Sequence, residues 1–253
     1  ARRYSVRRQR QVCRRDSHNA STPSVVGGGR KGQPGEIALA HNGILSLDEL
    51  PEFSRPNLEA LSQPMEAGYV SISRVSAHTK YPAKFQLVAA MNPCKCGNLG
   101  MSNLEYSKAP KCAAEYQSKI SGPLMDRIDL QIEVPAVSPW DIADVKKGET
   151  SAEILKRVIK ARDIQRKRFE SFGIKDLSTN SELKGEILEN VTEMSPDAKE
   201  LLLTAANKMN LSARAYHRVL KIARTIADLQ NEIKVIKIHI AEALSYRRTA
   251  VSL

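Results

Sequence analysis

Two short apolar runs that end in polar residues mark the first half of the chain. Residues 43–50 read GILSLDEL and residues 88–93 read VAAMNP. Each run predicts a buried strand, with Asp48 and Glu49 following the first and Asn92 following the second. Ligands bind at the carboxyl edge of the strands in open α/β sheets, so these three side chains are candidate site residues.

An acidic pair beside an amide suits Mg-nucleotide hydrolysis. One carboxylate would hold waters of the metal, the other would polarise the attacking water, and the amide would orient it. The G-x-x-x-x-G-K-[ST] spacing of a phosphate-binding loop is not met by the triple glycine at 27–29. We therefore expect residues 16–36 to form a long surface loop, in which Arg30 and Lys31 could touch a backbone phosphate.

The pattern between the two strands predicts helices and a β-hairpin. A short helix is expected over 37–42, and a second helix from a cap at Ser54 to about Met65, before Gly68. Alternation over 69–74 and β-rich residues over 81–90 predict a hairpin that leads into the strand before Asn92. Basic side chains on it suit DNA contact or an ordinary exposed hairpin equally; they are Arg74, His78, Lys80 and Lys84.

The second half of the chain is predicted to be helical. Residues 122–127 read as a short helix or turn and 128–134 as a strand, followed by a linker and a domain boundary within 136–150. Helices are then expected over 151–169, 196–209, 213–229 and 236–246, the middle two capped by Ser195 and Ser212. The polar segment 173–194 is expected to join them loosely.

Composition narrows the partners and the compartment. The net charge of +11 favours an anionic partner, and seven arginines lie within residues 1–15. That segment suits a nucleic-acid-binding arm, a disordered tail, or a translated stretch outside the folded protein. The sequence contains no apolar run long enough to span a membrane, so we expect no membrane partner. Four cysteines in 253 residues indicate a reducing cytoplasm.

Three of the cysteines cluster after the second strand. Cys94, Cys96 and Cys112 flank a loop with glycine, serine and asparagine. They could hold zinc, but a closed structural zinc site needs four ligands, which favours free thiols over metal.

Long segments of the sequence resemble the magnesium-chelatase-like AAA+ ATPases, and among them the ComM/YifB-type competence proteins. These segments read HNGILSLDELPEFSRPNLEALSQPMEAGYVSISR, PAKFQLVAAMNPCKCG, SGPLMDRIDLQIEVP, LSARAYHRVLKIARTIADL and HIAEALSYR. The resemblance implies a partial AAA+ P-loop-type α/β core with an inserted β-hairpin over 17–136. A basic arm over 1–16 precedes the core, and an all-α helical lid over 137–253 follows it.

The resemblance also assigns roles to single residues. Asp48 and Glu49 match the Walker B pair, Asn92 matches sensor 1, Arg127 takes the arginine-finger position, and Arg214 matches sensor 2. Asp48 and Arg214 would then contact the Mg²⁺-bound nucleotide. The residues alone also allow a local Asp126–Arg127 ion pair and a purely structural Arg214.

ATP and Mg²⁺ are the cofactors that the resemblance implies, and DNA and a hexameric ring of copies are the implied partners. Members of the ComM type are understood as hexameric DNA helicases that promote branch migration in recombination and natural transformation. By the same resemblance, the hairpin over 69–84 and the glycine-rich residues 17–36 face the channel of the ring.

Departures from the family pattern bear on activity. The Walker A loop of the family would lie upstream of residue 17, the arginine-rich start does not resemble the family, and Ser46 replaces a bulky apolar residue. We expect the chain alone to be inactive as an ATPase. Two alternatives to a DNA-remodelling ATPase are a magnesium chelatase-type motor subunit and a non-hydrolysing module for DNA binding or ring assembly.

Overall fold

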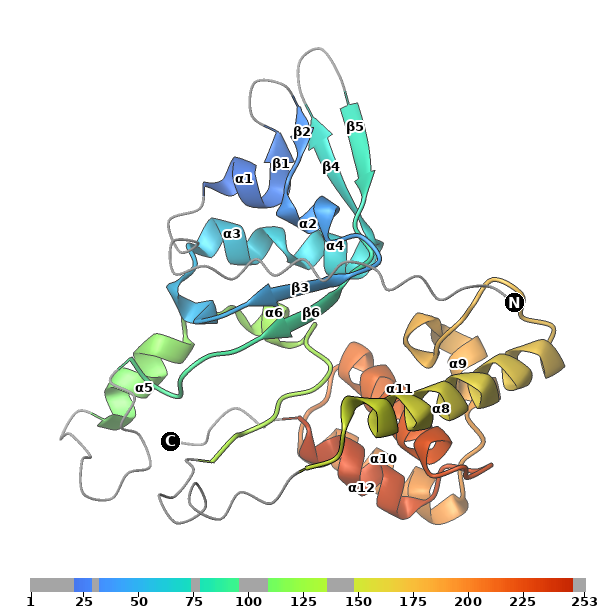
Figure 1. Ribbon diagram of the computed structural model, residues 1–253. Helices are drawn as coiled ribbons and strands as arrows, with labels where there is room; N and C mark the ends of the chain where they lie inside the picture. The colour runs from blue at the N-terminus through green and yellow to red at the C-terminus, as the bar shows by residue number, and fades with distance from the viewer. Residues whose placement is uncertain (1–20, 29–31, 74–77, 96–108, 136–147, 248–253) are drawn as a thin grey trace. The chain divides into compact units, whose positions relative to one another are not determined.

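The computed structural model describes residues 21–28, 32–73, 78–95, 109–135 and 148–247 (Figure 1). The chain divides into two compact units between Ile128 and Asp129. The first is a mixed α/β unit with small sheets, and the second is helical. The expected division at 136–137 stays a prediction.

Within its described residues, the first unit combines short helices with three two-stranded sheets. Its elements are α1 (Thr22–Val26), β1 (Gly27–Gly28), β2 (Gln33–Pro34), α2 (Glu36–Leu39), β3 (Ile44–Leu47), η2 (Leu50–Glu52), α3 (Arg55–Ala60), α4 (Ser62–Ala67), β4 (Tyr69–Ser73), β5 (His78–Pro82), β6 (Gln86–Ala89), α5 (Ala109–Gln117) and α6 (Gly122–Met125).

The two strands that precede the candidate site residues pair in parallel. In β3 and β6, Ile44 lies opposite Gln86 and Leu47 lies opposite Ala89. Alternate residues of β3 point into the core, where Leu45 is 1% exposed. Ser46 falls on the opposite, half-buried face, so a small polar side chain does not enter the core at that position.

The helix expected between Ser54 and Met65 is divided in two. α3 ends at Ala60, and α4 continues from Ser62 to Ala67. Gly68 then ends α4 in a left-handed conformation, with φ 75°, which glycine adopts without a Cβ clash. The Gly68 break is confirmed, and the helical region reaches two residues beyond the expected end.

Residues 16–36 are not one long loop, and that expectation is wrong for their described part. They include α1, β1 and β2, and β1 pairs with β2 as a small antiparallel hairpin. This hairpin lies beside the β4–β5 hairpin (Figure 1), where the Tyr81 hydroxyl donates to the Gly32 carbonyl at 2.7 Å. A Cβ at Gly27 would lie 2.7 Å from the Gly35 backbone nitrogen and 2.8 Å from the Gln33 carbonyl oxygen, and φ there is 107°, so the tight β1–β2 hairpin requires glycine at this position.

The predicted β4–β5 hairpin is confirmed, with Tyr69 opposite Pro82. The strand expected over 81–90 is interrupted, because β5 ends at Pro82 and β6 begins at Gln86. β5 also begins at His78, so the connection between the hairpin strands is shorter than the sequence predicted.

The strand predicted over 128–134 is wrong. The structure assigns neither helix nor strand to residues 128–135. Alternating apolar residues form a strand only where a neighbouring edge supplies hydrogen bonds, and no described strand pairs with this segment. Leu130, Ile132 and Val134 are 48%, 69% and 82% exposed.

The second unit consists of helices around one core, as predicted. Its elements are α8 (Ser151–Ser171), η3 (Asn180–Glu182), α9 (Gly185–Val191), α10 (Pro196–Lys208), α11 (Ala213–Leu229) and α12 (Lys237–Ser245). The Ser212 cap is confirmed, since its hydroxyl accepts from the Ala215 N–H at 3.2 Å. Ser195 precedes α10 without making such a cap bond.

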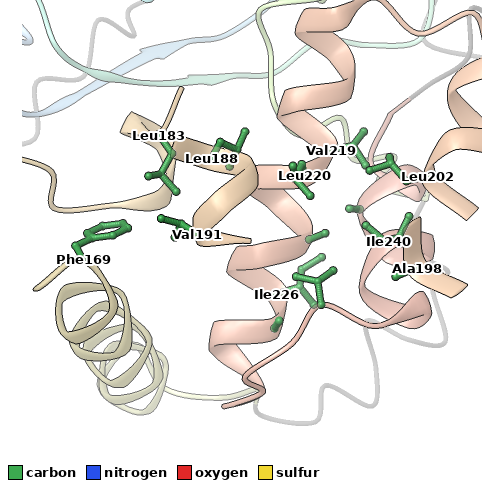
Figure 2. Packing of buried hydrophobic residues seen from close by; sticks show 14 residues of the cluster. Phe169, Leu183, Leu188, Val191, Ala198, Leu202, Val219, Leu220, Ile226 and Ile240 are labelled. Carbon is green, nitrogen blue, oxygen red and sulfur yellow. The ribbon is translucent and has the colours of Figure 1, made fainter. Parts of the chain in front are cut away.

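The segment 173–194 is more ordered than the loose connection that we expected. It contains η3 and α9, and Leu183 and Leu188 are fully buried in the helical core (Figure 2). Overall polarity misled the prediction, because a few apolar side chains suffice to anchor a segment to a core.

A buried charge network lies in the helical unit beside the apolar cluster. Arg224 and Asp228 are 0% and 1% exposed. The Asp228 carboxylate accepts hydrogen bonds from Arg224, Arg168 and Asn180. Since the Arg224 guanidinium also donates to the carbonyls of Glu232 and Ile233, the network joins α8, η3, α11 and the segment after α11.

Candidate functional site

The acidic pair lies where the sequence predicted, directly after β3. Asp48 and Glu49 are exposed, whereas Leu47 before them and Leu50 after them are buried at 4% and 2% exposure. Two buried leucines therefore fix the short loop and leave both carboxylates accessible.

The backbone at Glu49 has an uncommon conformation. Its φ and ψ are both 48°, in the left-handed region that non-glycine residues seldom adopt. The Glu49 N–H donates to Asp48 Oδ1 at 2.9 Å, which orients the Asp48 carboxylate. Strained backbone of this kind concentrates at functional sites, where the surrounding structure holds it in place.

Parallel pairing brings the loop of Asn92 beside the loop of the acidic pair. The pairing continues past the strands, because the Ala90 N–H donates to the Leu47 carbonyl at 2.9 Å and the Leu50 N–H donates to the Ala90 carbonyl at 3.0 Å. Asn92 lies two residues further on and is exposed. Asp48, Glu49 and Asn92 are thus gathered at one edge of the parallel pair.

Arg127 follows α6 in the same unit and is held by its own surroundings. Its guanidinium pairs with Glu66 Oε2 at 2.9 Å and donates to the Pro123 carbonyl at 2.6 Å. The side chain is only 15% exposed. Sequence reasoning missed Glu66, and no sequence signal could have found it, because 61 residues separate the partners.

Arg214 belongs to the other unit, in the first turn of α11. It is exposed, whereas Arg218 and Lys221 further along α11 are half-buried. Arg218 forms an ion pair with Asp129, and Lys221 Nζ donates to the Ser181 carbonyl at 2.9 Å. Burial is the main cause that lowers the pKa of Lys221. These two later cations support the helical unit, whereas Arg214 is exposed at the start of α11.

The candidate DNA-contacting residues are only partly described. Lys80 and Lys84 are exposed, and the Lys80 ammonium lies 4.9 Å from the centre of the Tyr69 ring. Arg30, Lys31 and Arg74 lie outside the described residues.

The cysteine cluster is likewise described in part. Cys94 is fully buried and Cys112 is half-buried, and neither of them forms a disulfide. Cys96 lies outside the described residues. Within the described ranges, no three metal-binding side chains come together. A zinc site that includes Cys96 stays a prediction.

None of the helices in the described part of the chain is long and apolar enough to cross a membrane.

Comparison with known families decides the relationship. The family described as "Magnesium chelatase, subunit ChlI" matches residues 3–142, and "Magnesium chelatase, subunit ChlI C-terminal" matches residues 148–247. The chain belongs to the magnesium chelatase ChlI family. This confirms the resemblance drawn from the sequence motifs. The match starts at residue 3, so the expectation that the arginine-rich start lies wholly outside the family is wrong.

Individual relatives place the chain near the competence proteins. It is 45% identical over 231 residues to competence protein ComM of Haemophilus influenzae, which covers 91% of this chain and 44% of ComM. It is 40% identical over 240 residues to YifB of Salmonella typhimurium, covering 94% of the chain and 46% of YifB. YifB of Escherichia coli is 40% identical over 246 residues, with 96% and 47% covered. The chain therefore spans about half the length of the curated relatives that it matches.

Proposed function

We propose that this member of the ChlI family is part of an AAA+ ATPase that couples ATP binding and hydrolysis to DNA remodelling. The observation that carries the proposal is the parallel pair β3–β6, whose carboxyl ends deliver Asp48, Glu49 and Asn92 to neighbouring loops. Similarity to the competence protein ComM favours DNA over a porphyrin as the partner.

The donor set at this edge fits Mg²⁺ and a nucleotide. Carboxylate oxygens are the hard ligands that a hydrated Mg²⁺ prefers, and Mg²⁺ supplies neutralisation of phosphate charge when bound. Asp48, whose carboxylate is oriented by the Glu49 N–H, would hold the Mg²⁺ through its bound waters. Glu49 polarises the attacking water, and Asn92 orients it.

Two arginines complete the proposed chemistry. Arg214, on the helical lid, would bind the γ-phosphate of the nucleotide. Arg127 would bind the phosphate at the site of the next copy in a hexameric ring and neutralise its charge. Arg127 is paired with Glu66 in the single chain. Phosphate in a neighbouring copy would have to replace Glu66 as its partner.

Glu49→Gln tests the hydrolytic role. The 253 residues contain no G-x-x-x-x-G-K-[ST] loop, so the isolated chain should show negligible ATPase activity. In a full-length protein that carries this loop upstream, Glu49→Gln should abolish hydrolysis and retain ATP binding, because the amide cannot polarise water but preserves the size of the side chain. A radiolabelled-phosphate assay with equilibrium binding measures both. Glu200→Gln, an exposed carboxylate of α10, is the matched control.

Normal turnover by Glu49→Gln would refute the assignment of the acidic pair. Measurable, Glu49-dependent turnover by the isolated chain would refute the need for an upstream loop.

The double variant Lys80→Gln/Lys84→Gln tests the proposed DNA surface of the β4–β5 hairpin and the residues that follow it. If both lysines contact phosphate, the slope of log affinity against log salt should fall by roughly 2, since each neutralised phosphate contributes about 0.9 on duplex DNA. Fluorescence anisotropy of the chain with labelled duplex, at several salt concentrations, measures it.

The control neutralises two exposed lysines of α10, Lys199 and Lys208, which changes the net charge equally. Equal slopes for the hairpin variant and the unsubstituted chain would remove the hairpin from the DNA surface.

A magnesium chelatase-type motor subunit is the second candidate, favoured by the description of the matching family. It predicts ATP turnover without a salt-dependent DNA affinity.

A non-hydrolysing DNA-binding or ring-assembly module is the third candidate, since the chain itself lacks a phosphate-binding loop. It predicts DNA affinity that Glu49→Gln leaves unchanged, without turnover in any longer form.

A further inference from the structure

Helix α5 lies against both loops that carry the candidate hydrolytic residues. It runs from Ala109 to Gln117 and buries Ala113 and Tyr116, each 5% exposed. Its last two residues, Tyr116 and Gln117, contact different loops: one follows β3 and the other follows β6.

Tyr116 engages the loop of the acidic pair. Beyond the effect of burial, the Glu52 carboxylate acts on its hydroxyl and raises the pKa of Tyr116. Glu52 is the third residue after Glu49, and its N–H donates to the Glu49 carbonyl at 2.8 Å. Lys119 Nζ lies 3.6 Å from Glu52 Oε1 and 5.3 Å from the centre of the Tyr116 ring, which holds the carboxylate and the ring together.

Burial and nearby carboxylates favour the protonated form of Tyr116. Burial raises the pKa of Tyr116, and the carboxylates of Glu52 and Glu49 and the Cys94 thiol raise it further. The protonated phenol is thus available to donate to the Glu52 carboxylate.

Gln117 engages the loop of Asn92. Its Nε2 donates to the carbonyl of Pro93, the residue after Asn92, at 2.8 Å. Cys94 follows Pro93 and is 0% exposed. This loop is thus held from one side by the pairing of Ala90 and from the other by α5.

We propose that Tyr116 and Gln117 are positioning residues that fix the spacing between Glu49 and Asn92. Because they are neighbours on one helix, a change in either loop must move α5 or break a polar contact with it. The role in hydrolysis rests on the proposed ATPase function, whereas the bracing of the two loops is testable in this chain without turnover.

The structural test uses the buried Cys94 thiol as a probe of loop opening. In a background with Cys13→Ser, Cys96→Ser and Cys112→Ser, Cys94 should react slowly with a maleimide. Gln117→Leu and Tyr116→Phe should each raise the labelling rate about fivefold or more, the effect of one lost polar contact on local opening. Tyr246→Phe, which removes another tyrosine–glutamate bond at 3.1 Å in the helical unit, is the matched control. Rates equal to the control for both variants would overturn the bracing.

The catalytic test separates kcat from KM in the full-length protein with a phosphate-binding loop. Both variants should lower kcat for ATP about tenfold or more and leave KM within about twofold, since small misplacements of a catalytic group affect the transition state most. If the two residues had a merely structural role, the variants would have a lower melting temperature but would not show a lowered kcat with an unchanged KM.

Glu49→Gln, measured in parallel, separates this inference from the proposed function. Loss of turnover in Glu49→Gln with unchanged kcat in both α5 variants would overturn the positioning role alone. Normal turnover in Glu49→Gln would overturn the hydrolytic function, and the catalytic role of α5 with it.

Discussion

The two units of the chain differ in where they place their polar groups. The helical unit buries Arg224 and Asp228 beside an apolar cluster that includes Phe169 and Leu202 (Figure 2). The α/β unit keeps Asp48 and Glu49 exposed on a loop after a two-stranded parallel pair. The charged groups of the helical unit are buried in its interior, whereas those of the acidic pair in the α/β unit are accessible to solvent. The buried charge network stabilises the helical unit, whereas the exposed acidic pair is a candidate for chemistry, and substitutions can test this contrast.

Asp228→Ala should have the largest effect on stability. It leaves the guanidinium groups of Arg224 and Arg168 without their carboxylate, and breaking a buried ion pair costs about 3–5 kcal/mol. Hydrogen exchange read by mass spectrometry should show lost protection across α8, α11 and α12 and unchanged protection in β3 and β6.

The control for Asp228→Ala is Glu149→Ala, which breaks an Arg157–Glu149 pair whose side chains are 54% and 51% exposed. Its cost should stay below about 1 kcal/mol. Equal loss of protection in both units after Asp228→Ala would show that they do not unfold separately.

Ser212→Ala should have an intermediate effect on stability, and the corresponding substitution in the α/β unit should have a smaller one. The Ser212 hydroxyl caps α11, and loss of such a cap costs about 1 kcal/mol. Ser54 precedes α3 without a cap bond from its side chain, so Ser54→Ala should cost less. Urea unfolding of the two variants measures the difference. A larger cost for Ser54→Ala would mean that helix starts contribute more in the α/β unit than the geometry indicates.

Alkaline pH should have the smallest effect, and it concerns Tyr116 of the α/β unit. Folding raises the pKa of Tyr116, chiefly by burial, so the folded state favours the protonated phenol. The contribution of this group to the free energy of unfolding is therefore complete below about pH 10 and is lost as pH rises through the folded pKa. Tyr116→Phe should make the fall in stability above pH 10 less steep. Urea midpoints at pH 8 and at alkaline pH measure it, and an identical fall in both proteins would contradict the prediction.

The sequence predicted elements whose signals are local. The Ser212 cap, the Gly68 break and the β4–β5 hairpin follow from residue types and short-range periodicity. The edge that gathers Asp48 and Asn92 was also predictable, because parallel strands end at the same side of a sheet.

Features that depend on distant partners were not predictable in this way. The strand expected over 128–134 fails because no described strand pairs with it. The partner of Arg127 is Glu66, and the bond from Gln117 to Pro93 spans 24 residues. Such contacts are set by the packing of whole elements, which periodicity does not report.

The left-handed backbone of Glu49 has a consequence for any search for more robust variants. Glycine at position 49 would adopt the same φ and ψ without steric cost and should gain about 1 kcal/mol from that relief. It would also remove the carboxylate proposed to polarise water. Selection for thermal stability alone would therefore favour replacement of Glu49 by glycine. Retention of glutamate at this position would indicate that its carboxylate is needed for function.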